Sequence, residues 1–242
     1  MPNTSFTFNK HFLDANILVG AWLEWDAQHN IVKKYIDCNS HERYTSKRAW
    51  MEARHVLEKY RRLVNNYLCK FEDDFGMDFN LNYIDREIAR FNRKYLEGIA
   101  NKSDKTKVES FIKDHLSEIT NCVLGAGSIE LLLEDAVNKF KIALNTLDNE
   151  CRNDHTSSIF KHETCPLKYE SHYPFEKSEL MKTVIYDNDV YIILDAYYIK
   201  ETFVKSDMCL ITTDYEHILS KKLDIERILV GINVESPELI HS

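Results

Sequence analysis

The apolar residues follow strand-like spacing near both ends of the chain and helix-like spacing in the middle. Residues 12–20, FLDANILVG, form a short apolar run rich in β-branched side chains, which predicts a buried strand followed by a helix. Residues 44–71 place apolar side chains three and four positions apart. This spacing predicts an amphipathic helix with Thr45 or Ser46 as its N-cap.

Helical spacing continues over residues 80–150, with a break at the GAGS sequence of residues 125–128. Ser128 can cap the helix that follows this break. Residues 149–178 show no clear period, and we expect a loop-rich crossing there. The stretch 184–203, VIYDNDVYIILDAYYIKETF, fits either a mostly helical segment or a hairpin followed by a helix.

The C-terminal part of the chain alternates between strand and helix signals. An apolar run MCLIT is followed by a helical stretch from His217 to Leu223 and by a final apolar run ILVGINV. A succession of strand, helix and strand is typical of a parallel α/β sheet. We expect MCLIT to lie beside the N-terminal strand, so that Asp14 and Asp214 fall near the carboxyl ends of neighbouring strands, where active groups gather in such sheets.

Composition and charge narrow the class of protein. The 242 residues are 44% hydrophobic and 29% charged, which is ordinary for a globular chain. The formal charge of −8 argues against a protein that simply coats nucleic acid, but acidic metal ligands in a nuclease would contribute to it. No apolar run approaches the roughly 18 residues of a membrane span, and the N-terminus lacks a signal-peptide core. We therefore expect a cytoplasmic protein with no membrane contact, whose six cysteines are thiols.

Five carboxylates interrupt apolar structure in this sequence. Each has an ordinary explanation as a helix-surface, N-cap or turn residue, but an ionised carboxylate within an apolar stretch needs a compensating partner. Several carboxylates in one pocket tolerate neutral pH only with divalent cations, and hard oxygen ligands favour Mg²⁺ or Mn²⁺. The candidate acids are Asp14, Glu52, Asp189, Asp195 and Asp214.

The order and spacing of these acids match four motifs of one family. The motifs are apolar-Asp-x-Asn-apolar at 13–18, Thr-Ser followed by Glu at 45–52, Asp-x-x-Ile-x-x-x-Ala at 189–196 and apolar-apolar-Thr-x-Asp at 210–214. In these motifs the sequence resembles the PIN-domain family of metal-dependent ribonucleases. The tail VGINVESPEL is also similar to the last strand of that family. The resemblance covers about half of the chain, roughly its first and last 60 residues.

The resemblance implies an α/β fold with a central parallel sheet flanked by helices. We expect a single PIN-like domain over 1–242, with its core at about 8–71 and 181–240. The stretch from about 72 to 180 exceeds the usual length of the family and reads as a large helical and loop insertion between the two halves of the core.

The third acid has two candidates. Asp195 lies 19 residues before Asp214, which is close to the interval of short family members, whereas Asp189 fits the local motif but lies 25 residues away. A hairpin over 184–194 would favour Asp195, and a helix would favour Asp189. We favour Asp189 and keep both.

The resemblance also implies roles for the site residues. We expect a metal-dependent endoribonuclease in which Asp14 and Asp214 are the most direct ligands of Mg²⁺ or Mn²⁺, while Glu52 and the third acid act directly or through water. Asn16 and Thr212 would orient the ligands or the scissile phosphate. The basic residues nearest to Glu52, which are Arg43, Lys47 and Arg48, are the candidates for contacts with the RNA.

An alternative function and an alternative metal remain. The same fold could serve as a non-catalytic module that binds RNA or a protein partner through the helical insertion, and an inhibitory partner or a homodimer is compatible with either function. Cysteine and histidine are zinc ligands, but the spacing within the loop-rich stretch matches no specific zinc pattern, so we expect surface loop residues there. These residues are Cys151, His155, His162 and Cys165.

Overall fold

The computed structural model describes residues 9–38, 41–75, 83–152, 160–184 and 186–241. The chain forms two compact units, which are described separately. The sheet unit consists of the described residues of 1–22, 30–54 and 146–242, and the helical unit of those of 23–29 and 55–145. The longer segment of the helical unit therefore spans residues 55–145, whereas we expected the insertion at about 72–180. Within the described residues, no helix is both long and apolar enough to cross a membrane.

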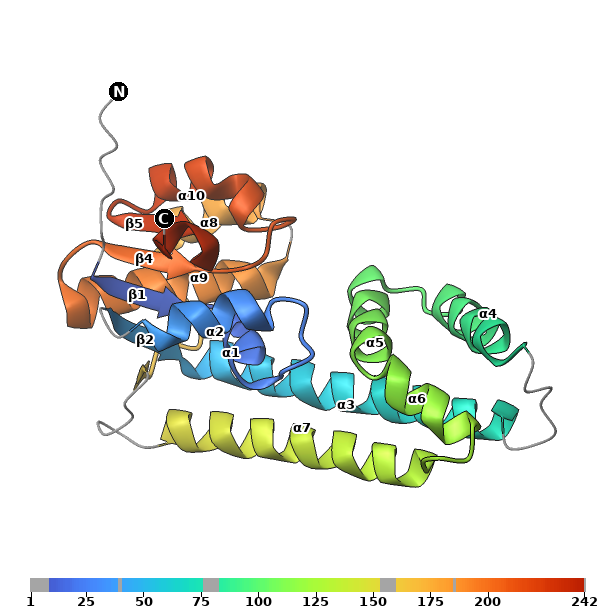
Figure 1. The fold of residues 1–242 in the computed structure, drawn as a ribbon. Coiled ribbons are helices and arrows are strands. Elements are labelled where there is room, and N and C mark those ends of the chain that lie inside the picture. Colours follow the sequence, from blue (N-terminus) through green and yellow to red (C-terminus); the bar gives the residue numbers. More distant parts are fainter. Residues whose placement is uncertain (1–8, 39–40, 76–82, 153–159, 185, 242) are drawn as a thin grey trace. The chain divides into compact units, whose positions relative to one another are not determined.

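In the part of the chain that the structure describes, the sheet unit contains one parallel sheet of five strands in the order β3-β2-β1-β4-β5 (Figure 1). The central strand β1 pairs with β4 in the register Phe12 to Leu210. The expected α/β class and the expected neighbourhood of these two strands are therefore confirmed. The strands are β1 Lys10–Leu13, β2 Glu42–Ser46, β3 Lys161–Glu163, β4 Met208–Ile211 and β5 Ile232–Glu235.

Helices flank this sheet. Helix α9 packs against β2 and β4, and α10 packs against β5 and α8. A short π-helical segment, Lys200–Val204, continues α9. The helices that contribute to the sheet unit are α1 Ala15–Trp22, α2 His29–Asp37, the first two turns of α3 Lys47–Phe75, the end of α7 Ile129–Arg152, α8 Pro174–Thr183, α9 Asp187–Ile199 and α10 Lys222–Ile228.

The predicted strand FLDANILVG is wrong in its second half. Strand β1 ends at Leu13, and helix α1 begins at Ala15. Asp14 occupies the N-cap position of this helix, because its carbonyl oxygen accepts from the N–H groups of Ile17 and Leu18. Its Oδ1 also accepts a hydrogen bond of 2.6 Å from the Ala15 N–H. Six of the eight residues of α1 are buried, so the helix lacks the one-sided period that would have separated it from a buried strand.

Two further boundaries differ in part from the sequence prediction. The residues at 44–46 are the end of β2 rather than the start of the helix. The expected N-cap is confirmed at Ser46, since its Oγ accepts from the Ala49 N–H at 3.1 Å. The stretch predicted as a loop-rich crossing contains the end of α7, the strand β3 and the start of α8. Strand β3 has three residues, which is too short to show a period of two.

The helical unit is built on aromatic side chains. Trp25 makes edge-to-face contacts with Phe111 and Phe140, at ring-centroid distances of 5.6 and 5.3 Å.

The expected break at GAGS is confirmed, because Gly125 has a φ of 74° and the Ser128 Oγ accepts from the Leu131 N–H at 3.4 Å. Besides parts of α3 and α7, this unit contains α4 Ile84–Glu97, α5 Lys102–Asp114 and α6 Leu116–Val123.

Candidate acidic active site

Asp14 lies at the carboxyl end of β1 and is only 3% exposed. The Thr212 hydroxyl donates a 2.7 Å hydrogen bond to its Oδ2, and the Ala15 N–H binds its Oδ1. The exposed Asn16 approaches Oδ2 more loosely, at 3.5 Å. Burial raises the pKa of Asp14 to about 6, and the nearby carboxylate of Asp214 adds to the increase, while the three donors partly offset it.

Asp214 follows the neighbouring strand β4 and organises the turn after it. Its N–H donates to the Thr212 Oγ1 at 3.0 Å, so a single hydroxyl connects Asp214 with Asp14. Its Oδ1 accepts from the His217 N–H at 2.8 Å, and its Oδ2 lies 3.1 Å from the His217 Nδ1. Thr212 is therefore placed to orient the Asp14 carboxylate and to hold the backbone of Asp214.

Two helices bring the remaining acids to the same edge of the sheet. Glu52 lies in the second turn of α3 and accepts a hydrogen bond from the Asn188 side chain. Asp189 lies in the first turn of α9. Burial raises the pKa of each to about 7, and repulsion from the other acids contributes: Asp14, Asp189 and Asp214 act on Glu52, and Asp14 and Asp214 act on Asp189.

The donor set of this acidic cluster, defined as Asp14, Glu52, Asp189 and Asp214, fits a divalent cation. Burial raises the pKa values of three of its carboxyls, repulsion from the neighbouring acids adds to the increase, and a bound cation would relieve that repulsion. Among the described residues, one ligand atom each from Asp189, Asp214 and His217 lie within 4.8 Å of one another. Sequence reasoning missed His217, although a histidine three residues after the acid of the fourth motif was a readable signal.

The structure separates the two candidates for the third acid. Helix α9 begins at Asp187, so the hairpin alternative is wrong. Asp195 is fully buried two turns further along this helix and does not belong to the acidic cluster. Its Oδ1 accepts a 2.6 Å hydrogen bond from the Tyr169 hydroxyl, and its Oδ2 pairs with the Arg48 Nε at 3.4 Å. Burial raises the pKa of Asp195, and these partners counteract the increase.

Two of the three arginine and lysine residues proposed for RNA contacts are engaged inside the protein. Arg43 is buried, and its Nη2 donates to the carbonyl oxygens of Tyr35 and Cys38. Arg48 pairs with Asp195, donates to the Pro166 carbonyl oxygen at 3.2 Å and lies over the Tyr191 ring. Lys47 is exposed at the start of α3 and is the member of this set that presents its charge to solvent.

Of the four zinc candidates, the structure describes the side chains of Cys151 and Cys165. Cys151 is buried at the end of α7, so the expected surface loop position is wrong for this residue, and burial raises its pKa to about 12. The Cys165 Sγ donates to the Asp195 carbonyl oxygen at 3.9 Å. His155 and the side chain of His162 lie outside the described residues.

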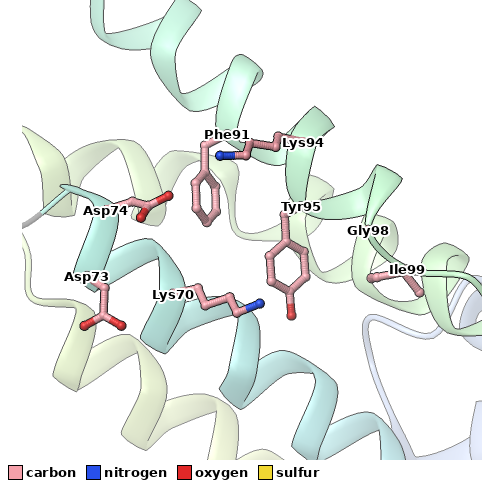
Figure 2. Close-up of a pocket in the computed structure, with 8 residues that line it drawn as sticks. All are labelled: Lys70, Asp73, Asp74, Phe91, Lys94, Tyr95, Gly98 and Ile99. Carbon is pink, nitrogen blue, oxygen red and sulfur yellow. The ribbon is translucent and has the colours of Figure 1, made fainter.

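A pocket of about 460 Å³ lies in the helical unit, apart from the acidic cluster. Figure 2 shows that it is lined by residues of α3, α4 and the segment after α4, with the amino group of Lys70 directed toward Tyr95. The Lys70 Nζ lies 5.4 Å from the centre of that ring. The pocket combines two lysines with two aspartates and two aromatic rings. Its lining residues are Lys70, Asp73, Asp74, Phe91, Lys94, Tyr95, Gly98 and Ile99.

No family model matches the chain, and no curated protein or solved structure gives a significant match.

Proposed function

We propose that the protein is a Mg²⁺- or Mn²⁺-dependent endonuclease of PIN type that hydrolyses RNA phosphodiester bonds. The observation that carries this proposal is the acidic cluster, in which four carboxylates from two strand ends and two helix starts converge, and in which burial and repulsion from neighbouring acids raise the pKa values of Asp14, Glu52 and Asp189. Like charges converging at one edge of a sheet destabilise the fold, so their retention is best explained by a cation that uses them. The four sequence motifs that resemble the family contain these same four residues.

Each residue of the cluster has a role that its position supports. Asp189 and Asp214 would hold the cation together with His217, because their ligand atoms already lie within 4.8 Å of one another. Asp14 and Glu52 would complete the site directly or through water. A bound Mg²⁺ or Mn²⁺ supplies the Lewis acidity that activates water and stabilises the leaving oxygen. Thr212 holds the Asp14 carboxylate, and Lys47 would attract the phosphate backbone.

The first test is removal of the metal. We expect the purified protein to cleave a single-stranded RNA in Mn²⁺ or Mg²⁺, to lose this activity in excess chelator and to regain it when the cation is restored. Asp14→Asn purified in parallel is the control for a contaminating nuclease. Cleavage that persists in chelator, or that is equal in the control protein, would contradict the proposal.

A second prediction concerns pH. Burial and repulsion raise the pKa values of Asp14, Glu52 and Asp189 to about 6 to 7, from ordinary values of 3.8 for Asp and 4.5 for Glu. Between about pH 4 and 7 the folded state therefore binds more protons than the unfolded state, so these groups make the metal-free protein less stable as the pH rises. Since protons compete with the cation, we expect Mn²⁺ to raise the melting temperature more at pH 8 than at pH 5.

This prediction is measured by thermal melts with and without millimolar Mn²⁺ at both pH values. A shift of at least about 3 °C at pH 8 corresponds to roughly 1 kcal/mol for a chain of this size. Asp187→Asn, which removes an exposed acid two residues before Asp189, is the matched control and should retain the shift. The absence of a shift in the wild-type protein at pH 8 would contradict an occupied metal site.

The second candidate function is a non-catalytic module that binds a partner through the helical unit. The observation that favours it is the pocket of Figure 2, whose aromatic rings and charged side chains come from that unit alone. Such a module has no use for the repulsion within the acidic cluster. A protein that shows neither a Mn²⁺ shift nor cleavage, but that loses binding of RNA or of a partner on Tyr95→Ala, would support this second function over the first.

A further inference from the structure

His217 is held against the acidic cluster by three contacts. Its backbone N–H donates to the Asp214 Oδ1 at 2.8 Å, and its Nδ1 lies 3.1 Å from the Asp214 Oδ2. The Tyr186 ring packs edge to face on the imidazole, with 4.6 Å between ring centroids and 81° between the planes. Because these contacts restrict the ring on more than one side, the imidazole is already positioned beside the carboxylates when no metal is bound.

We propose that His217 supplies a nitrogen ligand to the metal, so that the site prefers Mn²⁺ to Mg²⁺. This inference rests on the proposed metal-dependent nuclease. The ligand atoms of His217, Asp189 and Asp214 lie within 4.8 Å of one another. Metal–ligand bonds of about 2 Å place opposite ligands of one cation roughly 4 Å apart, so small side-chain movements bring all three into one coordination sphere.

The chemistry of the donors decides which cation benefits. Mg²⁺ is a hard cation that prefers oxygen ligands and keeps several waters, and it gains little from an imidazole. Imidazole binds first-row transition cations well, and the carboxylates of the cluster suit Mn²⁺. A site with oxygen ligands alone would discriminate weakly between Mg²⁺ and Mn²⁺. Addition of His217 to Asp189 and Asp214 creates a mixed nitrogen and oxygen set that favours Mn²⁺.

The spacing between the His217 Nδ1 and the Asp214 carboxylate is compatible with this role. Two neighbouring ligands with metal bonds of about 2 Å lie roughly 3 Å apart, and Nδ1 lies 3.1 Å from the Asp214 Oδ2. When the ring proton is on Nε2, the lone pair on Nδ1 is available to a cation that Asp214 also binds. The competing explanation is that His217 only orients Asp214, and this predicts equal effects on every cation that Asp214 binds.

The test measures metal binding rather than activity. Mn²⁺ affinity is determined by titration of the full-length wild-type protein and of His217→Gln with the electron paramagnetic resonance signal of free Mn²⁺, and Mg²⁺ affinity by competition. We expect His217→Gln to weaken Mn²⁺ binding at least about tenfold and to change Mg²⁺ binding by less than about threefold. Pulsed spectra of bound Mn²⁺ should show a directly coordinated ¹⁴N in the wild-type protein and lose it in His217→Gln.

Controls separate this inference from the proposed function. His55→Gln makes the same exchange at an exposed position of α3 and should leave both affinities unchanged. Equal loss of Mn²⁺ and Mg²⁺ affinity in His217→Gln, or an absence of the ¹⁴N signal in wild-type protein that binds Mn²⁺, would overturn the nitrogen ligand and leave the nuclease standing. Failure of the wild-type protein to bind either cation would overturn both.

Discussion

Asp14→Asn should abolish metal-dependent cleavage and at the same time make the metal-free protein more stable above pH 7. The loss of activity should be at least about a hundredfold, which is the effect of removing one group that stabilises charge in a transition state. The fold should tolerate the change because the amide oxygen can still accept from Ala15 and the amide NH₂ can donate to the Thr212 hydroxyl.

The gain in stability follows from the pKa of Asp14. Burial raises the pKa of this carboxyl from its ordinary value of 3.8 to about 6, so its ionisation opposes folding. For an acid whose pKa is raised on folding, the destabilisation caused by ionisation grows as the pH rises. Here it grows from about pH 4 to pH 6 and is constant above about pH 7. A shift of two pKa units corresponds to about 3 kcal/mol, and we expect roughly half of this in Asp14→Asn, because the amide loses the charge-assisted hydrogen bonds.

Urea unfolding in chelator at pH 5 and pH 8 measures the stability difference, and a single-turnover RNA assay measures cleavage. Asp187→Asn is the matched control, since it removes an exposed acid from the same end of the sheet unit and should change neither quantity greatly. If Asp14→Asn keeps full cleavage, the activity belongs to another site. If it is markedly less stable at pH 8, the cost of burying the ionised carboxylate does not dominate at Asp14.

Asp195→Ala should have the reverse profile, with a large loss of stability and no loss of metal affinity. Removal of this buried carboxylate leaves the Arg48 guanidinium without its ion-pair partner and the Tyr169 hydroxyl without its acceptor. Breaking one side of a buried pair typically costs about 3 kcal/mol or more. We therefore expect the free energy of unfolding to decrease by about 3 kcal/mol, while the folded protein binds Mn²⁺ as tightly as the wild type.

Asp189→Ala is the informative comparison, because it removes the other candidate for the third acid from the same helix. It should weaken Mn²⁺ binding and cleavage, and it should preserve or raise the metal-free stability at pH 8, since repulsion is relieved. Urea unfolding and a Mn²⁺ titration on both variants provide the measurements. A loss of Mn²⁺ affinity in folded Asp195→Ala, or normal affinity in Asp189→Ala, would reverse the assignment of the two acids.

The parts of the site that were predictable from sequence depend on short-range patterns. Asp14 and Asp214 follow apolar runs directly, and the meeting of parallel strand ends places them together. Asp189 and Asp195 could not be separated with certainty, because α9 is buried at seven of its thirteen positions and shows no clear polar face. Helix α1 was hidden for the same reason, since a helix buried at six of its eight positions and a buried strand have similar apolar compositions.

The remaining errors concern partners that are distant in sequence. Arg48 resembled a surface cation, but its Nε contacts Asp195, which lies 147 positions away in the sequence. Its Nη2 donates to the carbonyl oxygen of Pro166, which lies 118 positions away. The Arg43 Nη2 donates to carbonyl groups at the end of α2, which local spacing does not reveal. Such burial depends on tertiary contacts, and for this reason charge along the sequence overestimated the cationic surface.

The Thr212 hydroxyl makes the alignment of two strands part of the acid–base chemistry of the site. It donates to Asp14, which follows β1, and it accepts from the backbone of Asp214, which follows β4. The donated bond favours the ionised form of Asp14, and it exists only while β1 and β4 are paired in their present register. Separation of the carboxyl ends of β1 and β4 would therefore change the pKa of Asp14 even while β1 kept its own conformation.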